Sequence, residues 1–300
     1  MGFQDSMAIP RRFFLKMGAG ALLAPIIHSC TRQTEAQETL RASNSLLSIV
    51  KERGYFSIAT EDFYPPFEFL VNGKPVGLDH DLFALLQKYS TFEIRQEILP
   101  WKPILPGVGD GQFDAAVTAA IITEERAQYL DFTMPISETT QVYLKRLGDD
   151  GIQSVADLSG KTLGVQQGGA SFNALPGIET TLNQSGGKLG VIRQYGSFAE
   201  AYRDLEAGRV DAVINNIVSL SILVTEKPGI FELGQPIEPR SYAAWPVQKG
   251  NQVVLEYLNQ FMAEVRANGE LKRLQQLWLK RTFDLPDKPL LPGDRPLPTA

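Results

Sequence analysis

Apolar residues recur along the chain in two alternating patterns. Two segments have one apolar face at helical spacing, DLFALLQKY at 81–89 and FAEAYRDLEAG at 198–208. Short strand-like runs lie before, between and after these segments. The second helical segment closes with a glycine, a common helix C-terminus. Strands that alternate with helices predict an α/β fold with a largely parallel sheet. The strand-like runs are YFSIAT from Tyr55, FEIRQEI from Phe92, TLGV from Thr162 and AVIN from Ala212.

One unit occurs twice, as GQFDAAVTAA and, further on, as GRVDAVINNI. Each copy follows a helix and places glycine, aspartate, alanine and an apolar strand in the same order. For Asp114 and Asp211 we favour a structural role, in which the carboxylate accepts backbone N–H groups at a turn. Five residues beyond each aspartate the strands reach Ala119 and Asn216. Ligands of open α/β sheets gather beyond the carboxyl ends of strands, so these two residues are expected to face a shared cleft.

Residues 1–30 have the features of an export signal. Arg11 and Arg12 precede an apolar segment that is too short to cross a bilayer but has the length of a signal-peptide core. The segment resembles a twin-arginine signal, which predicts a periplasmic or other extracytoplasmic location. The alternative is a surface helix with two arginines. It is disfavoured because the arginine pair, the apolar segment and a small residue before Cys30 occur in the expected order.

The residues IHSC at 27–30 resemble a lipoprotein box, in which Cys30 is acylated and anchors the protein to the membrane. His28 departs from the small or apolar residue usual there. Two alternatives stay open: a spectator cysteine in a removed signal, and a Cys/His nucleophilic pair, which a cleaved leader disfavours. Residues 31–45 are polar and predict a flexible tether. Repeated prolines in 285–300 predict an extended tail that stays off the core.

The composition excludes several classes of function. The chain has 300 residues, a net charge of -5 and an ordinary apolar fraction, which is typical of a soluble globular protein. It has no basic run for a nucleic-acid partner. Two histidines and one cysteine are too few for an ordinary zinc site or a disulfide framework. We therefore expect no metal, no cofactor and no nucleic acid.

The stretch ITEERAQ places a positive charge unfavourably. Thr123 is typical of a helix N-cap, and Glu124 and Glu125 put negative charge in the first turn. Arg126 follows three residues after the cap, where Glu or Gln is preferred and the helix dipole disfavours a cation. Because residues that break local rules are often functional, we predict a negative partner for Arg126. The alternative is a surface ion pair with Glu124 or Asp131.

Several motifs together resemble a known family, the extracellular solute-binding proteins of polar amino-acid ABC transporters (family 3 solute-binding proteins). The resemblance covers about 46–283 and implies a two-lobed periplasmic-binding-protein fold, type II-like, with a ligand cleft between α/β lobes. Two crossover strands are expected near 138–143 and 241–247. This gives lobe 1 as 46–139 plus 242–284 and lobe 2 as 140–241, with hinge closure around the ligand. The motifs, in family order, are YPPFEF, GLDHDLF, PWKPILPGVGDGQFDA, ITEERAQYLDFTMPIS, SVADLSGKTLGVQQGG, AGRVDAVI and ANGELKRLQQLWL.

The resemblance also assigns a carboxylate site. Arg126 matches the family arginine that binds the ligand's α-carboxylate, and the planar guanidinium can donate two parallel hydrogen bonds to it. A second contact is expected from the turn QQGGAS, where free backbone N–H groups at the start of a short helix favour an anion. The turn residues concerned are Gly168, Gly169, Ala170 and Ser171.

Tyr64 and Trp101 match family positions whose rings enclose the ligand side chain, and Glu61 is the carboxylate that can meet a cation. Two positions depart from the family. Ile121 replaces a usual Ser or Thr hydroxyl, and Asn216 stands where an aspartate usually pairs with the α-ammonium. An amide can donate a hydrogen bond, so the site would suit a keto acid, a hydroxy acid or a modified amine. The alternative is a standard amino acid bound through compensating contacts.

The leading hypothesis is a monomeric binding protein without catalysis. It would capture an amino acid or a related carboxylate-bearing solute and deliver it to an ABC permease in the membrane. One alternative is an enzyme resembling the cyclohexadienyl dehydratases, which would need a positioned general acid, for which Glu61 is the candidate. Another is a sensory solute-binding module, which is disfavoured because the sequence shows no signalling domain.

Overall fold

The computed structural model describes Val50 and residues 52–297 of the chain. The predicted export signal at 1–30, with Cys30, and the predicted tether at 31–45 lie outside the described residues. Among the residues described, no helix is both long and apolar enough to cross a membrane.

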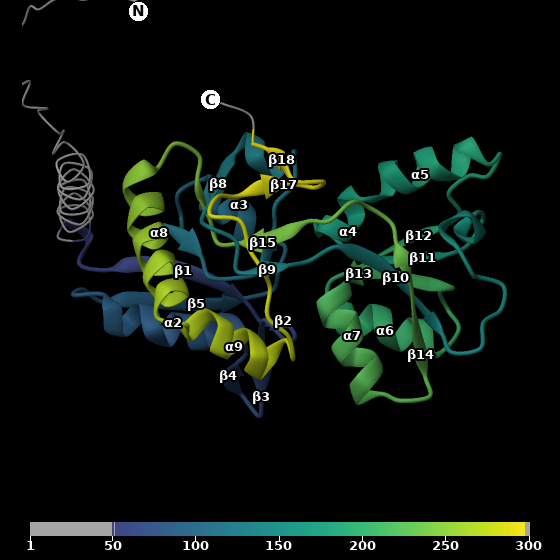
Figure 1. Ribbon diagram of the computed structural model, residues 1–300, viewed down its shortest axis with the longest axis horizontal. Coiled ribbons are helices and arrows are strands. Elements are labelled where there is room, and N and C mark those ends of the chain that lie inside the picture. The colour runs from purple at the N-terminus through teal and green to yellow at the C-terminus, as the bar shows by residue number, and fades with distance from the viewer. Residues whose placement is uncertain (1–49, 51, 298–300) are drawn as a thin grey trace, which may run out of the picture. The chain divides into compact units, whose positions relative to one another are not determined.

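Lobe 1 is built on a five-stranded sheet (Figure 1). Its second strand, which begins at Phe56, is buried along its whole length and pairs in parallel with both neighbours, and Phe56 lies opposite Ile94. The fourth strand runs antiparallel to the third and the fifth, so the sheet is mixed rather than wholly parallel. In spatial order the strands are β5 (Ile94–Leu99), β1 (Phe56–Glu61), β6 (Ala115–Ala116), β16 (Pro246–Gln248) and β8 (Leu130–Phe132).

Lobe 2 repeats this plan. Three strands pair in parallel, and the fourth runs antiparallel to both of its neighbours. The order is β12 (Ile192–Tyr195), β11 (Leu163–Gln166), β13 (Ala212–Asn216), β10 (Gln141–Arg146) and β14 (Phe231–Pro236). The strands predicted from Tyr55, Phe92, Thr162 and Ala212 are confirmed as β1, β5, β11 and β13.

Two connections join the lobes. A three-stranded antiparallel sheet of β7 (Ala120–Ile121), β15 (Tyr242–Ala244) and β9 (Ser137–Glu138) holds them side by side. The backbone N–H of Thr139 also donates to Ser241 O at 2.8 Å. The chain passes from β9 into β10 across 139–140 and returns from β14 to β15 across 237–241. The predicted lobe boundaries fall in these two connections.

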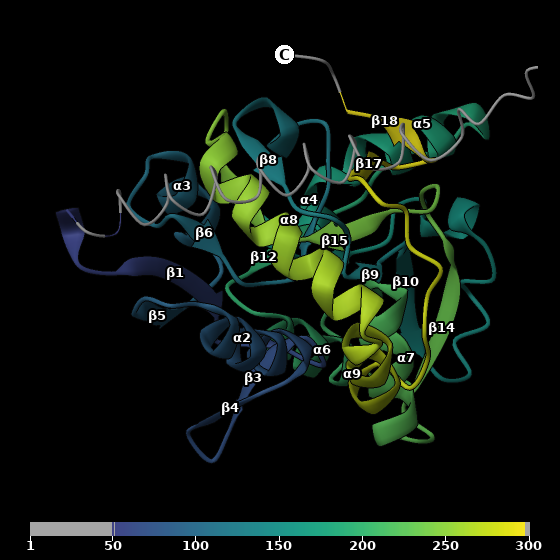
Figure 2. The same ribbon diagram turned by 60° about the vertical axis from the view of Figure 1, so that its left-hand side comes forward.

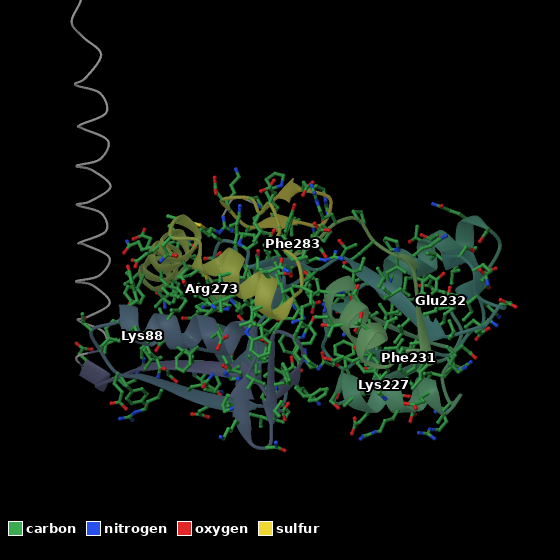
Figure 3. The ribbon with its side chains drawn as sticks, turned by 60° about the horizontal axis from the view of Figure 1, so that its bottom comes forward. Lys88, Lys227, Phe231, Glu232, Arg273 and Phe283 are labelled. Carbon is green, nitrogen blue, oxygen red and sulfur yellow. The ribbon has the colours of Figure 1, made fainter. Side chains whose placement is uncertain are left out.

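Helices cover the sheets. In lobe 1, α2 packs on α9, and α9 on α8, as Figures 1 and 2 both show. Lys88 on α2 and Arg273 on α9, labelled in Figure 3, both lower the pKa of Glu270, mainly through the hydrogen bond from Arg273. Lobe 1 contains α2 (Leu78–Tyr89), α3 (Ile104–Gly109), α8 (Gln252–Ala267), α9 (Glu270–Trp278), the 3-10 turn η1 (Arg126–Gln128) and the small sheet β2 (Phe63–Tyr64), β3 (Glu68–Val71), β4 (Lys74–Val76).

The predicted helix at 198–208 is confirmed as α6 and ends as expected. Gly208 follows the last turn with φ +72°, a left-handed conformation that a glycine adopts without strain. Lobe 2 contains η2 (Val155–Leu158), α4 (Ala170–Asn173), α5 (Leu175–Gln184), α6 (Phe198–Glu206) and α7 (Ile217–Glu226).

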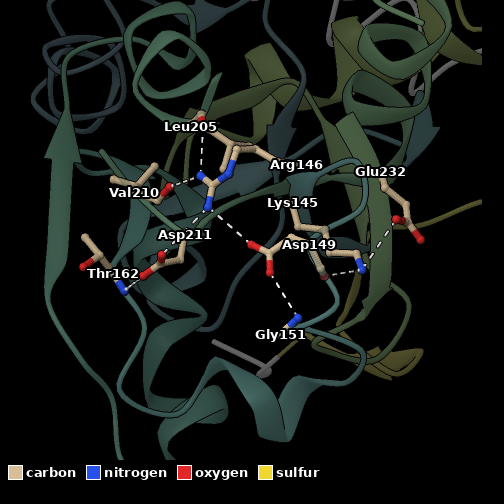
Figure 4. Close-up of polar contacts among 9 residues, drawn as sticks. All are labelled: Lys145, Arg146, Asp149, Gly151, Thr162, Leu205, Val210, Asp211 and Glu232. Carbon is tan, nitrogen blue, oxygen red and sulfur yellow. Dashed lines mark hydrogen bonds and ion pairs between the residues drawn. The ribbon is translucent and has the colours of Figure 1, made fainter. Parts of the chain in front are cut away.

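The structural role expected for the repeated aspartates is confirmed. Asp114 accepts a hydrogen bond from Ser57 N at 2.7 Å, and Asp211 accepts one from Thr162 N at the same distance. Each carboxylate thus caps the start of the neighbouring parallel strand. In lobe 2 this contact lies beside Arg146, whose guanidinium donates to the carbonyls of Leu205 and Val210 (Figure 4).

The expectation that the proline-rich tail stays off the core is wrong. Leu291 is only 4 % exposed and belongs to the apolar cluster that contains Tyr242 and Ala244. Prolines stop a helix but do not prevent the apolar residues between them from packing. Around this contact the chain forms the hairpin β17 (Leu290–Leu291) and β18 (Arg295–Pro296).

Candidate functional site

The two sheets direct polar side chains into one cavity. Glu61 ends β1 in lobe 1, and Gln166 ends β11 in lobe 2. Gln141 begins β10, which runs antiparallel and therefore starts at the edge where the parallel strands end. This is the edge at which open α/β sheets bind ligands. The lining residues are Glu61, Tyr64, Trp101, Ala119, Ile121, Arg126, Gln141, Gln166, Gly169, Ala170, Ser171, Phe198 and Asn215.

Arg126 brings a buried positive charge to this cavity. Instead of the predicted helix, the chain forms one 3-10 turn, and Thr123 Oγ1 accepts the backbone N–H of Arg126 at 3.2 Å. The side chain is 2 % exposed and donates to Ile121 O at 2.7 Å and Gly168 O at 3.4 Å. Among residues 52–297 no acidic side chain forms an ion pair with it, and burial lowers its pKa. A buried cation that meets only neutral carbonyls is costly unless an anion joins it.

Glu61 is the carboxyl group of the cavity wall. It is 2 % exposed and accepts a hydrogen bond from Gln166 Nε2 at 2.7 Å across the two lobes. Burial raises the pKa of Glu61 to about 8, although the bond from Gln166 and the charge of Arg126 act in the opposite direction. At neutral pH Glu61 is therefore largely protonated when no cation lies beside it.

Aromatic rings form the apolar walls. Trp101 lies under the guanidinium of Arg126, with 5.1 Å between the Arg126 Cζ atom and the ring centroid, and donates from Nε1 to Gly168 O at 3.0 Å. From the other side, Tyr64 stacks on Phe198 of lobe 2 with centroids 5.9 Å apart. The cavity thus offers flat faces for an organic side chain.

The predicted turn at 166–171 lies at the cavity. Gly168 has φ +68°, which a side chain would strain, and its carbonyl receives the bonds from Trp101 and Arg126. Within the described residues, the N–H groups of Ala170 and Ser171 have no hydrogen-bond acceptor. They are available to an anion held by Arg126.

Asn216 lies behind the cavity wall rather than on it. It caps α7 by accepting Ser219 N at 2.9 Å, and its Nδ2 donates to Tyr64 Oη at 2.7 Å and Ser219 Oγ at 3.0 Å. The neighbouring Asn215 lines the cavity in its place. The amide of Asn216 is therefore engaged by the protein itself.

The structure gathers most of the predicted site residues at one place. Gly168 and Asn216 contact lining residues without lining the cavity themselves. Cys30 lies outside the described residues. The predicted residues on the wall are Glu61, Tyr64, Trp101, Ala119, Ile121, Arg126, Gly169, Ala170 and Ser171.

Sequence reasoning missed four lining residues: Gln141, Gln166, Phe198 and Asn215. Gln166 and Asn215 lie at or beside the carboxyl ends of predicted strands, so the strand-end rule alone could have found them. Phe198 begins the helix that follows β12 and was read as part of its apolar face. Predicting Gln141 as a lining residue would have required the direction of β10 in the sheet, which the sequence does not give. In the described part of the chain, no cluster of three or more His, Cys, Asp or Glu side chains could hold a metal.

Comparisons with known proteins agree with this geometry. The model of the bacterial extracellular solute-binding proteins, family 3, matches residues 56–281. The chain is similar to the L-cystine-binding protein of Escherichia coli (strain K12), with 28% identity over 79% of this chain and 87% of that protein. It is also 28% identical to the L-arginine-binding protein of Pseudomonas aeruginosa, over 76% of this chain and 88% of that one.

Solved structures match as well. An ancestral arginine-binding protein bound to arginine aligns with a TM-score of 0.66 and 28% identity, over 75% of this chain and 98% of that chain. An ancestral amino acid-binding protein described as a precursor of cyclohexadienyl dehydratase aligns with a TM-score of 0.68 over 78% of this chain and 99% of that one. At 24% identity, that second match concerns the fold alone. The predicted two-lobed periplasmic-binding-protein fold is confirmed.

Proposed function

The chain belongs to the bacterial extracellular solute-binding proteins of family 3, and on that premise we propose that it captures an amino acid or a related carboxylate-bearing solute in the cavity between its lobes. It is the substrate-binding component of an ABC importer and delivers its solute to a membrane permease. Relatives are named for cystine, histidine and arginine, which agrees with a solute of this class.

The observation that carries the proposal is the state of Arg126. Its guanidinium is buried and stacked on Trp101, and among the described residues it bonds only to the carbonyls of Ile121 and Gly168. A carboxylate is the group that best fits the remaining donors, because it accepts two parallel N–H bonds and neutralises the charge. The unpaired N–H groups of Ala170 and Ser171 support the same site from lobe 2.

The rest of the cavity suits an organic side chain with a polar end. Tyr64, Trp101 and Phe198 provide aromatic faces, and Glu61 lies on the same wall. A cationic side chain would find there a carboxyl group that can ionise against it. A neutral side chain would find the protonated acid and the amide of Gln166.

We propose binding without catalysis. One observation favours an enzyme as second candidate: Glu61, protonated near neutral pH, has the state of a general acid. It is also the only carboxyl group among the lining residues, so no second acid or base accompanies it. A dehydration or elimination would need both roles to be filled.

The test is a calorimetric panel of amino acids and their keto, hydroxy and N-alkylated relatives on the exported part of the chain. Each solute that binds is then incubated with the protein and analysed by mass spectrometry. The proposal expects binding of at least one member and recovery of that solute unchanged. Conversion of the solute would establish the enzyme, and a panel without any binding would contradict the proposed function.

We also propose the route by which the protein reaches its location outside the cytoplasm. The family is extracellular, and the Arg11 and Arg12 pair supports export by the twin-arginine system. Acylation of Cys30 would then hold a monomer at the membrane beside its permease. The lobes at 46–139 with 242–284 and at 140–241 would close over the solute by bending at the two connections.

A further inference from the structure

One buried side-chain oxygen of the cavity wall, on Gln141, has no hydrogen-bond partner among the described residues. Gln141 is 1 % exposed, and its Oε1 accepts no hydrogen bond from any described residue. By contrast, Gln166 and Asn215, the other two amides of the wall, are engaged: Gln166 Nε2 donates to Glu61, and Asn215 Nδ2 donates to Tyr202 Oη. A buried carbonyl oxygen without a donor loses its hydration and gains nothing in return.

The place of Gln141 in the fold is fixed by its backbone. It begins β10 at the connection between the lobes, where its N–H donates to Glu238 Oε1 at 3.3 Å. Its side-chain Nε2 faces Thr139 O at 3.5 Å, which leaves Oε1 as the free end of the amide. In the antiparallel pair of β10 and β13, Gln141 lies directly opposite Asn216. Side chains opposite each other in such a pair share one face of the sheet.

Asn216 cannot serve a ligand at that place without losing its own bonds. Its Oδ1 caps α7, and its Nδ2 is bonded to Tyr64 and Ser219. Gln141, opposite Asn216 in the sheet, supplies a buried carbonyl oxygen that has no donor among the described residues. It lines the same cavity as Arg126, Ala170 and Ser171, which are the donors for a carboxylate.

We propose that Gln141 is a specificity-determining residue, whose Oε1 accepts an N–H group of the bound solute and so selects an amine over a keto group. The inference rests on the proposed function and refines its substrate class to amino-bearing carboxylates. An N–H group donates a hydrogen bond to Gln141 Oε1. A keto oxygen is itself an acceptor, so it would face Oε1 with no hydrogen between the two oxygens. A site built to hydrogen-bond a donor discriminates strongly against a ligand that lacks it. Gln141 would then be the contact that compensates for the neutral Asn216.

The test compares ligands rather than single affinities. Calorimetry gives the dissociation constants of the solute with its amino group and of its keto and hydroxy relatives, for the wild type, Gln141→Leu and Gln141→Met. A hydrogen bond to a charged donor corresponds to about a tenfold to hundredfold preference. Both variants should lose most of that preference, because affinity for the amine falls while affinity for the keto acid holds or rises.

Gln275→Leu is the matched control. Gln275 is as buried as Gln141, but its amide is fully bonded to Ile136 O and Phe283 N, and it does not line the cavity. This variant should keep the wild-type ratio even if it melts earlier. Met preserves the length of the Gln141 side chain, so a folded variant is available if Leu disturbs the strand.

The outcomes separate the two proposals. If the solute binds and Gln141→Met keeps the wild-type ratio of amine to keto acid, the inference is overturned while the proposed function stands. If neither amino acids nor their relatives bind the wild type, the proposed function fails and the inference fails with it.

Discussion

At the scale of single residues, the position of Arg126 is explained by what surrounds its side chain. Its backbone N–H is satisfied by Thr123 Oγ1, so the turn tolerates a cation near its start. The side chain is buried against Trp101. An ion pair with Glu124 is excluded, because Glu124 pairs with Arg295 at 2.6 Å instead. We propose that the unfavourable local placement is retained for a partner that residues 52–297 do not supply.

Arg126→Ala should weaken solute binding more than any other single change at the site. A buried charge-assisted pair that loses one partner costs about 2 to 5 kcal/mol, or roughly thirtyfold to several thousandfold in affinity. Ligand-induced thermal stabilisation, which follows affinity by mass action, should nearly disappear. Arg209→Ala, an exposed arginine paired with Asp204, is the control and should bind as the wild type does. A melting shift that survives in Arg126→Ala would exclude the carboxylate role.

Glu61 should couple binding to protons when the solute carries a cationic side chain. Because its pKa is raised to about 8, Glu61 keeps its proton below that pH when no ligand is bound. A cation beside Glu61 favours the carboxylate form instead. Binding then releases a proton below about pH 8, and affinity rises with pH until the group is ionised in the free protein. Calorimetry at about pH 7 in two buffers of different ionisation enthalpy measures the released proton. In Glu61→Gln the release should vanish; a proton count that is unchanged would assign it to another group.

At the scale of elements, a pair of buried acids lies on β3 and α2. The pair contacts the segment around Trp245, where the chain has returned to lobe 1. Glu68 and Asp79 are both fully buried, and burial, followed by the nearby charge of Asp79, raises the pKa of Glu68. Burial also raises the pKa of Asp79, to about 6. Thr118 donates to Glu68 and Trp245 Nε1 donates to Asp79. The raised pKa values indicate that the pair keeps a proton. Its hydrogen bonds to Thr118 and Trp245 connect neighbouring segments of lobe 1.

This pair predicts a stability that falls as pH rises. Both groups bind protons more tightly in the folded state, so the unfolded state holds fewer protons from about pH 4 upward and stability declines with rising pH. Glu61 and Glu238, with pKa values raised to about 8 and about 7, add to the same decline. Glu68→Gln keeps a neutral donor without a titrating proton, so its melting temperature should fall less steeply above about pH 6 than that of the wild type. The exposed Glu256→Gln serves as control, and equal slopes in all three proteins would contradict the shared proton.

How far the sequence predicts these elements depends on how local their causes are. β1, β11 and α6 follow from apolar periodicity, and the roles of Asp114 and Asp211 follow from turn chemistry that the repeat displays. Arg126 was recognised because it breaks a local rule. The docking of Leu291 could not be predicted, because its partners are distant in the sequence and nothing local marks them.

Gln141 shows the same limit at the site itself. Its importance depends on β10 running antiparallel to β13, which places the first residue of one strand opposite the last residue of the other. Sequence patterns give the existence of a strand but not its direction in a sheet. The strand-end rule and the family resemblance placed Asn216 at the ligand, whereas the structure shows its amide bonded to Tyr64 and Ser219.

At the scale of the whole molecule, we propose that residues 1–30 export the protein so that the two lobes can act outside the cytoplasm. Replacing Arg11 and Arg12 together by Lys should leave the precursor in the cytoplasm, because the receptor of a twin-arginine signal tolerates little change. Cell fractionation measures the result, and the single change Cys30→Ala separates export from anchoring. That variant should be exported but released from the membrane. Normal export of the double Lys variant would refute the route, and a membrane-bound Cys30→Ala protein would refute the anchor.

Binding should also depend on both lobes together, because each contributes to the same solute. Arg126, Trp101 and Glu61 come from lobe 1, while Gln166, Ala170 and Ser171 come from lobe 2. A carboxylate held by Arg126 and by the free N–H groups of lobe 2 would connect the lobes directly. The solute is then part of the interface that keeps the cavity closed.

The central claim is that this cavity holds a solute by its carboxylate on Arg126, and the most direct measurement is a crystal structure of the protein with its tightest calorimetric solute. The account predicts the carboxylate between the lobes, with two guanidinium N–H bonds of about 2.7 to 2.9 Å to its oxygens. A solute bound outside the cavity, or inside it while Arg126 still meets only the carbonyls of Ile121 and Gly168, would contradict the account.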